Sequence, residues 1–154
     1  MLISSFNVAI QERSVMRRDI IMGLRERDFK PVFKAMNRTL ANIPGKLYDN
    51  EYPKKEAYYH TVLLTLLWAC ELHVHAEEWT SRGISDLVLE YHGDVYVIEL
   101  KIGSVKTALQ QIKDRGYAEK YAAAPYLAMI GIEINTEKRN LKEYCLELAI
   151  GRQE

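Results

Sequence analysis

Residues 81–101 read SRGISDLVLEYHGDVYVIELK and predict two short strands joined by a tight turn at residues 92–94. The second run is rich in β-branched and aromatic side chains, which favour strands. Because side chains alternate across a strand, Glu99 and Lys101 point to one face of the sheet, and the apolar residues that alternate with them point to the other. The stretch therefore predicts a hairpin with charged groups on one face.

Three charged residues interrupt these apolar runs, namely Asp86, Glu99 and Lys101. Burying two carboxylates and an ammonium among aliphatic side chains is costly unless something compensates them. A divalent cation held by the carboxylates, with the lysine facing a substrate phosphate, would compensate all three. In the alternative interpretation, Asp86 caps a strand, and Glu99 and Lys101 form a surface pair on an exposed sheet face.

Further motifs surround these charges along the chain. In order, they are Glu56 to His60, Glu78 with Thr80 to Gly83, Ala108 to Lys113, Gly116 to Ala118, and Ile130 to Ile132 with Glu137 to Asn140. Together with the D-x(12)-E-L-K pattern, this ordered set resembles the PD-(D/E)XK nuclease superfamily over roughly residues 22–140. More narrowly, it resembles the nuclease domain at the end of certain bacterial proteins that carry an ATPase-like domain in front of it.

The resemblance implies a restriction-endonuclease-like α/β fold and a nuclease that hydrolyses phosphodiester bonds in DNA with Mg²⁺ or Mn²⁺. Asp86 and Glu99 would be carboxylate ligands, with the backbone carbonyl of Leu100 as a third oxygen, since Mg²⁺ prefers oxygen ligands. Lys101 would orient the attacking water or stabilise the transition state electrostatically. Glu56 matches a helical acidic residue that supports the metal through water; alternatively, it is an acidic residue favoured by the dipole at a helix start.

Other residues are candidates for contacts to the substrate. Related nucleases place a glutamine on the helix after the strands, where Gln110 and Gln111 both fit the periodicity, and we assign Gln111. Arg82, just before the strand that carries Asp86, is a candidate phosphate contact. Lys113 is a candidate contact to nucleic acid, with a solvated helix face as the alternative.

The rest of the chain predicts helices and strands around this hairpin. Apolar spacing predicts helices over residues 19–41 (divided at Pro31), 52–70 and from a capping Ser104 to about Tyr121, with strands over 72–79 and 126–132. Alternation favours a last strand over 144–150, although Leu141, Cys145 and Leu148 would also fit a helix. The order of helix, three strands, helix and strand indicates an α/β sandwich with a mixed sheet. We expect residues 1–48 to form an N-terminal helical extension and residues 49–154 to form the nuclease-like domain.

The formal net charge is zero, but the charges are unevenly distributed. Residues 1–55 carry a net +5, residues 56–100 a net −7 and residues 101–154 a net +2. An acidic centre between basic flanks suits a metal site with phosphate contacts from the flanks, although helices with solvated faces explain the flanks as well. The two cysteines predict neither a disulfide nor a zinc site, and the lack of a long apolar run or signal-peptide pattern predicts a cytoplasmic protein.

These features favour a metal-dependent nuclease that acts on DNA. The alternative is a catalytically silent module of the same fold for DNA binding or protein docking, but such a module has no physical reason to keep buried charges. A plain interaction domain that docks through the basic residues 1–40 would need neither the carboxylates nor the lysine. The chain has no G-x-x-x-x-G-K-S/T loop and cannot itself supply such an ATPase, so we expect a stand-alone version, a fragment of a longer parent chain, or one half of a split system with an ATPase partner. Many nucleases of this superfamily cut as homodimers, but no stretch of the sequence identifies a dimer surface.

Overall fold

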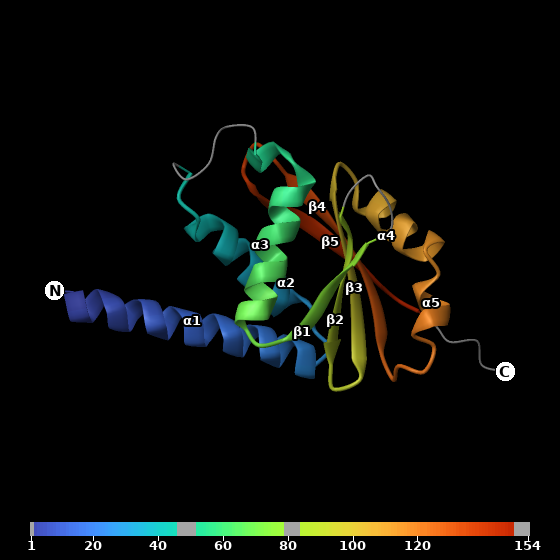
Figure 1. Cartoon of the computed structure of the whole chain (residues 1–154), viewed down its shortest axis with the longest axis horizontal. Helices are drawn as coiled ribbons and strands as arrows, with labels where there is room; N and C mark the ends of the chain where they lie inside the picture. Colours follow the sequence, from blue (N-terminus) through green and yellow to red (C-terminus); the bar gives the residue numbers. More distant parts are fainter. Residues whose placement is uncertain (1, 46–51, 79–83, 150–154) are drawn as a thin grey trace.

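The computed structural model describes residues 2–45, 52–78 and 84–149 (Figure 1). The helices are α1 (Leu2–Arg25), α2 (Lys30–Asn42), the 3₁₀ helix η2 (Tyr52–Lys54), α3 (Glu56–Ala69), α4 (Val105–Asp114) and α5 (Tyr117–Lys120). The strands are β1 (His73–Glu78), β2 (Ile84–Tyr91), β3 (Asp94–Ile102), β4 (Leu127–Asn135) and β5 (Asn140–Leu148). None of the described helices is both long and apolar enough to cross a membrane.

The strands form one five-stranded sheet in the order β1-β2-β3-β4-β5. Strands β3 and β4 are parallel, and the other neighbouring pairs are antiparallel. A parallel pair needs a crossover connection, which α4 and α5 provide here. The predicted order of helix, three strands, helix and strand is confirmed, and the mixed sheet with flanking helices and an N-terminal helical part agrees with a restriction-endonuclease-like fold.

The predicted hairpin is formed by β2 and β3. Its turn residues His92 and Gly93 have φ angles of 48° and 86°, as a two-residue type I′ turn requires. Asp94 follows the turn, pairs with Tyr91 across the strands, and accepts bonds of 2.9 and 3.0 Å from the guanidinium of Arg27. A tight turn and a partly buried ion pair therefore fix this end of the hairpin.

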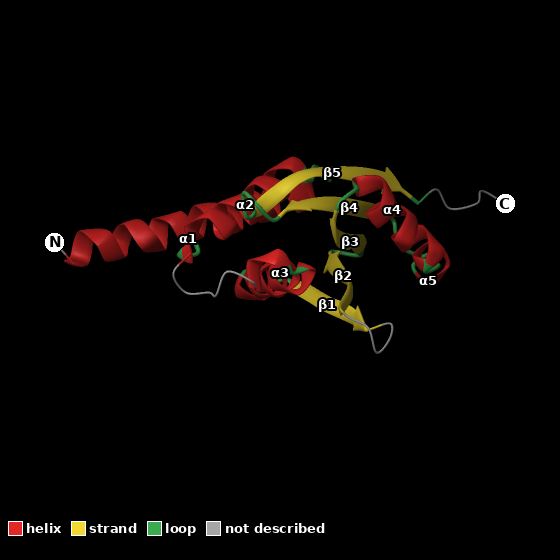
Figure 2. Cartoon of the chain, turned by 90° about the horizontal axis from the view of Figure 1, so that it is seen from above, coloured by secondary structure: helices red, strands yellow, loops and turns green. Residues whose placement is uncertain are grey.

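Helices cover both faces of the sheet, as Figure 2 shows, with α1, α2 and α3 on one side and α4 and α5 on the other. The larger hydrophobic cluster lies under α1, α2 and α3 and includes Leu24, Met36, Leu63, Tyr96 and Ile130. The smaller cluster lies under α4 and α5 and includes Val88, Val97, Leu109, Ile112 and Tyr117. Alternate residues of β3 belong to different clusters, so the predicted alternation of its side chains is confirmed.

Gly131 allows α4 to lie directly on β4. A Cβ atom at this position would come within 2.6 Å of the Val105 carbonyl oxygen and 2.9 Å of the Leu109 amide nitrogen. Such approaches are too close for any side chain. Because Gly131 is the parallel partner of Glu99, the same contact holds α4 beside the charged end of β3.

The boundaries of two predicted helices are different in the structure. The helix predicted from Ser104 to Tyr121 is divided, because Gly116 adopts a left-handed conformation (φ 73°) that ends α4 before α5 begins. Ser104 does cap α4, accepting a bond of 3.2 Å from the Lys106 amide. The helix predicted over 52–70 is interrupted at Lys55, whose backbone is extended (φ −101°, ψ 137°).

At the N-terminus, residues 2–25 form one helix that projects from the body in Figure 1. The predicted division near Pro31 is confirmed, since α2 begins at Lys30 with the proline in its first turn. The predicted boundary between an N-terminal extension and the nuclease-like domain, at residue 48, lies outside the described residues and stays a prediction. Side chains of α1 and α2 from Ile20 to Leu40 share the larger hydrophobic cluster with the sheet.

Candidate functional site

Two carboxylates meet on the face of the sheet that α4 covers. Leu87 of β2 pairs with Ile98 of β3, and the strands are antiparallel, so Asp86 and Glu99 are the next two residues opposite each other. Because side chains alternate along a strand, both carboxylates point to the face opposite to that of Leu87 and Ile98. Asp86 is fully buried and Glu99 is 5% exposed. The two acidic residues singled out in the sequence are therefore brought together in a largely water-excluded place.

A residue that the sequence did not indicate joins them. Nη1 of Arg115, the residue that ends α4, lies 2.5 Å from Oδ1 of Asp86 and 3.2 Å from Oε2 of Glu99. One guanidinium nitrogen therefore donates to both carboxylates. In the sequence this arginine stands in a helical segment, 29 and 16 residues from the two carboxylates, and only the tertiary fold brings it to them.

The electrostatics of this pair favour additional positive charge. Burial, and then the hydrogen bonding and negative charge of Asp86, raise the pKa of Glu99 to about 9, against the opposing effects of Arg115 and Lys101. Two adjacent buried carboxylates resist losing both protons. At neutral pH the pair therefore favours either a retained proton or another cation.

Lys101 and Glu56 form the edge of the site. Nζ of Lys101 lies 3.5 Å from Oε2 of Glu56 and 4.0 Å from Oε1 of Glu99. The other oxygen of Glu56 accepts a bond of 3.0 Å from the Ile102 amide. Glu56, at the start of α3, thus fastens that helix to the end of β3 and holds the lysine between two carboxylates.

Oδ2 of Asp86 is buried and has no hydrogen-bond partner among the described residues, so it is available to a hard cation. Oε1 of Gln111, on α4, is also buried without such a partner. Mg²⁺ and Mn²⁺ prefer carboxylate and amide oxygens. No group of three or more His, Cys, Asp or Glu side chains able to hold a metal occurs in the described part of the chain. A cation here would therefore have two carboxylate ligands, and neutral oxygens would complete its shell.

The structure separates the two glutamines that the sequence left open. Gln110 is exposed and donates a bond of 2.8 Å to Asp114 on its own helix. Gln111 is half-buried, with its amide oxygen in the interior. This difference favours Gln111. The side chain of Leu100 is buried in the larger hydrophobic cluster, and the metal-binding role of its carbonyl stays a prediction.

Of the two predicted contacts to nucleic acid, Lys113 lies in the described part of the chain. Lys113 is paired with Glu147 of β5 at 2.5 Å. Arg82 is outside the described residues. A further carboxylate, Glu77 of β1, is paired with Lys120 of α5 at 2.5 Å.

The hydroxyl group of Tyr117 lies beside Asp86. Burial, and then the neighbouring carboxylate of Asp86, raise the pKa of this hydroxyl. The hydroxyl oxygen is buried and has no well-formed hydrogen bond among the described residues. The segment 115–120 therefore places three side chains against carboxylates of the sheet. Arg115 and Tyr117 lie beside Asp86, and Lys120 pairs with Glu77.

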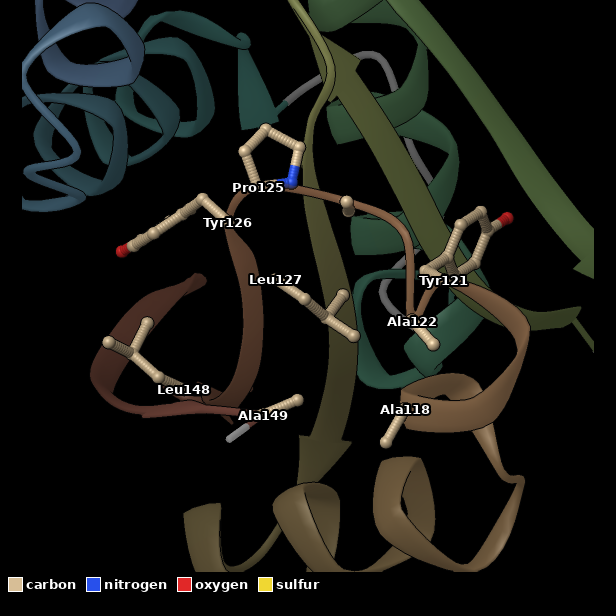
Figure 3. Close-up of a pocket in the computed structure, with 9 residues that line it drawn as sticks. Ala118, Tyr121, Ala122, Pro125, Tyr126, Leu127, Leu148 and Ala149 are labelled. Carbon is tan, nitrogen blue, oxygen red and sulfur yellow. The ribbon is translucent and has the colours of Figure 1, made fainter. Parts of the chain in front are cut away.

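A pocket near the start of β4 is separate from these groups. Its lining, drawn in Figure 3, includes Tyr121, Tyr126, Leu127 and Leu148, and none of the candidate site residues. Leu127 pairs with Val95 at the beginning of β3, whereas the charged residues lie towards the end of that strand. The pocket is therefore not part of the candidate site.

Comparison with known proteins gives a family match over most of the fold. A profile of the PD-(D/E)XK nuclease superfamily matches residues 54–144. An uncharacterised protein in the vnfD 5′ region of Azotobacter chroococcum mcd 1 is 32% identical over 125 residues, which are 78% of this chain and 24% of that protein. The chain thus spans about a quarter of the length of this curated relative. No solved structure matches the chain significantly.

Proposed function

The chain belongs to the PD-(D/E)XK nuclease superfamily, and we propose that it is a metal-dependent nuclease that hydrolyses phosphodiester bonds in DNA. The observation that carries this proposal is the pair of buried carboxylates, Asp86 and Glu99, next to Lys101. A docking module gains nothing from burying these charges, because removing carboxylates from water is costly. The intact set therefore favours catalysis over a silent role.

Asp86 and Glu99 would hold Mg²⁺ or Mn²⁺ through their carboxylate oxygens, with the Leu100 carbonyl and the Gln111 amide oxygen as neutral donors. When bound, such an ion lowers the pKa of a coordinated water and stabilises negative charge on the phosphate oxygens. The two carboxylates bring their oxygens from rigid strands, so their spacing is set before any ligand binds.

Lys101 and Glu56 would act as a pair at the edge of the site. The ammonium of Lys101 is the group that would donate to a phosphate oxygen or orient the attacking water. Glu56 would be a positioning residue, since it bonds both the lysine side chain and the backbone at Ile102. A fixed ammonium stabilises developing charge more effectively than a freely rotating one.

Recognition of DNA would use its backbone and not its base sequence. The chain contains no helix-turn-helix or zinc-finger pattern, and Arg82 and Lys113 are the proposed phosphate contacts. Lys113 would exchange Glu147 for a phosphate when DNA binds. Because the sequence resembles nuclease domains that follow an ATPase-like domain, an ATPase-like domain on a parent chain or partner is part of the proposed biological setting.

The direct test is cleavage of supercoiled, linear and single-stranded DNA by the purified chain in Mg²⁺ or Mn²⁺. Asp86→Asn should abolish cleavage. Asp94→Asn is the matched control, because Asp94 is also buried and paired with an arginine but lies at the turn end of the hairpin. Cleavage that survives Asp86→Asn would refute the assigned ligand. Mn²⁺ binding without cleavage would indicate a missing partner. The absence of both Mn²⁺ binding and cleavage would favour the docking module.

A further inference from the structure

One side chain holds the position between the two proposed metal ligands. The same nitrogen of Arg115 donates to an oxygen of Asp86 and to an oxygen of Glu99. The Arg115 side chain is 23% exposed, whereas those of its two partners are 0% and 6% exposed. The guanidinium therefore reaches from the rim of the site to two carboxylates on the sheet.

A divalent ion and this guanidinium would compete for the same carboxylates. Mg²⁺ binds its oxygen ligands at about 2.0–2.1 Å, so an ion that takes either of the oxygens bonded to Arg115 as a ligand would displace the nitrogen there, and an ion on any other oxygen of the pair would still lie beside a like charge. The guanidinium cannot leave by losing its proton, because arginine stays charged in proteins. Binding of the ion at these oxygens therefore requires the side chain to move.

The local backbone is suited to such a movement. Arg115 is the C-cap residue that follows α4, and Gly116 after it has a left-handed φ of 73° with open space where a side chain would be. The segment that follows, α5, is a single short turn of helix. Neither the helix nor the sheet would have to unfold for the guanidinium to leave.

We infer that Arg115 is a positioning residue that competes with the divalent cation for Asp86 and Glu99, so that metal binding releases the guanidinium. This inference rests on the proposed function, since it assumes that the two carboxylates bind metal. The affinity for metal is then set by the exchange of one cation for another and not by the ligands alone.

The first test compares Mn²⁺ binding by the wild type, Arg115→Gln and Arg27→Gln, measured by electron paramagnetic resonance without DNA. Arg27→Gln is the matched control, because it removes the same charge from another Arg–Asp pair. Arg115→Gln should bind Mn²⁺ about tenfold more tightly than the wild type, the scale of one hydrogen bond between charged groups. Arg27→Gln should match the wild type.

The outcomes separate this inference from the proposed function. Mn²⁺ binding by the wild type with equal or weaker binding by Arg115→Gln would overturn only the inference. No Mn²⁺ binding by any of the three proteins would overturn the proposed metal site and the inference with it.

A second test needs no variant, so it is valid even if Arg115→Gln folds poorly. Phenylglyoxal modifies accessible arginines, and peptide mass spectrometry measures the rate at each position. Saturating Mg²⁺ should increase modification of Arg115 and leave that of Arg27 unchanged. Unchanged or slower modification of Arg115 in protein that has bound metal would overturn the inference.

Discussion

Changing the two buried carboxylates to amides of the same shape should affect the stability of the metal-free protein differently. Oδ1 of Asp86 is fully buried and accepts the shorter of the two bonds from Arg115. Asp86→Asn keeps an amide oxygen as the acceptor but removes the negative charge that Arg115 faces, and a hydrogen bond between two charged groups is worth about 1.5–3 kcal/mol. For a chain of this size, each kcal/mol lowers the melting temperature by about 2–4 °C, so a decrease of about 3–12 °C is expected.

Glu99→Gln should instead change the dependence of stability on pH. The pKa of Glu99 is raised in the folded protein, so between about pH 4.5 and 9 the folded state binds more protons than the unfolded state. The stability of the wild type therefore falls as pH rises through this range, by at most about 1.4 kcal/mol per pH unit for one proton. Glutamine cannot ionise, so the variant lacks this decrease.

The assay is urea-induced unfolding at pH 6, 7 and 8 in a metal chelator, with Asp94→Asn as the control for loss of a carboxylate paired with an arginine. In Glu99→Gln the 3.2 Å bond from Arg115 becomes a weaker bond to a neutral acceptor, which offsets part of the stability gained by removing the buried charge. The diagnostic quantity is therefore the change in relative stability with pH. Stability of Glu99→Gln relative to the wild type should increase from pH 6 to pH 8, and parallel pH profiles would refute the electrostatic reasoning.

Two further predictions concern the supports of the site. Lys101→Ala should leave Mn²⁺ affinity nearly unchanged and lower the turnover of DNA cleavage by about 10²-fold, as removal of a transition-state donor does; a collapse of Mn²⁺ affinity would show a structural role instead. Gly131→Ala should destabilise the protein by about 1–3 kcal/mol in urea unfolding, because the added methyl group meets the backbone of α4, and wild-type stability would contradict that packing.

Local patterns account for the parts of the fold that could be predicted from the sequence. The hairpin follows from alternating side chains and a two-residue turn that includes Gly93, both of which are properties of neighbouring residues. The same alternation puts Glu99 and Lys101 on one face of β3. Only the register of β2 against β3 was needed to bring Asp86 to them, and a tight turn fixes that register.

The parts that could not be predicted depend on contacts between distant segments. Periodicity alone treats Gln110 and Gln111 alike, whereas in the folded protein Gln110 is exposed and Gln111 is half-buried. The end of α4 at Gly116 depends on a backbone conformation that helical spacing does not reveal. The role proposed for Arg115 depends on this helix end, because the end of α4 directs the Arg115 side chain to the two carboxylates.

The charges around the site support an exchange of cations. Asp86, Glu99 and Glu56 carry three negative charges when ionised, and Arg115 and Lys101 carry two positive charges, so one negative charge is left over. The raised pKa of Glu99 is consistent with this excess, because a retained proton removes it. A divalent ion in place of the guanidinium would make the remaining set neutral without the proton. The released guanidinium would then be available for the single negative charge of a phosphodiester, for which its planar donors are well suited.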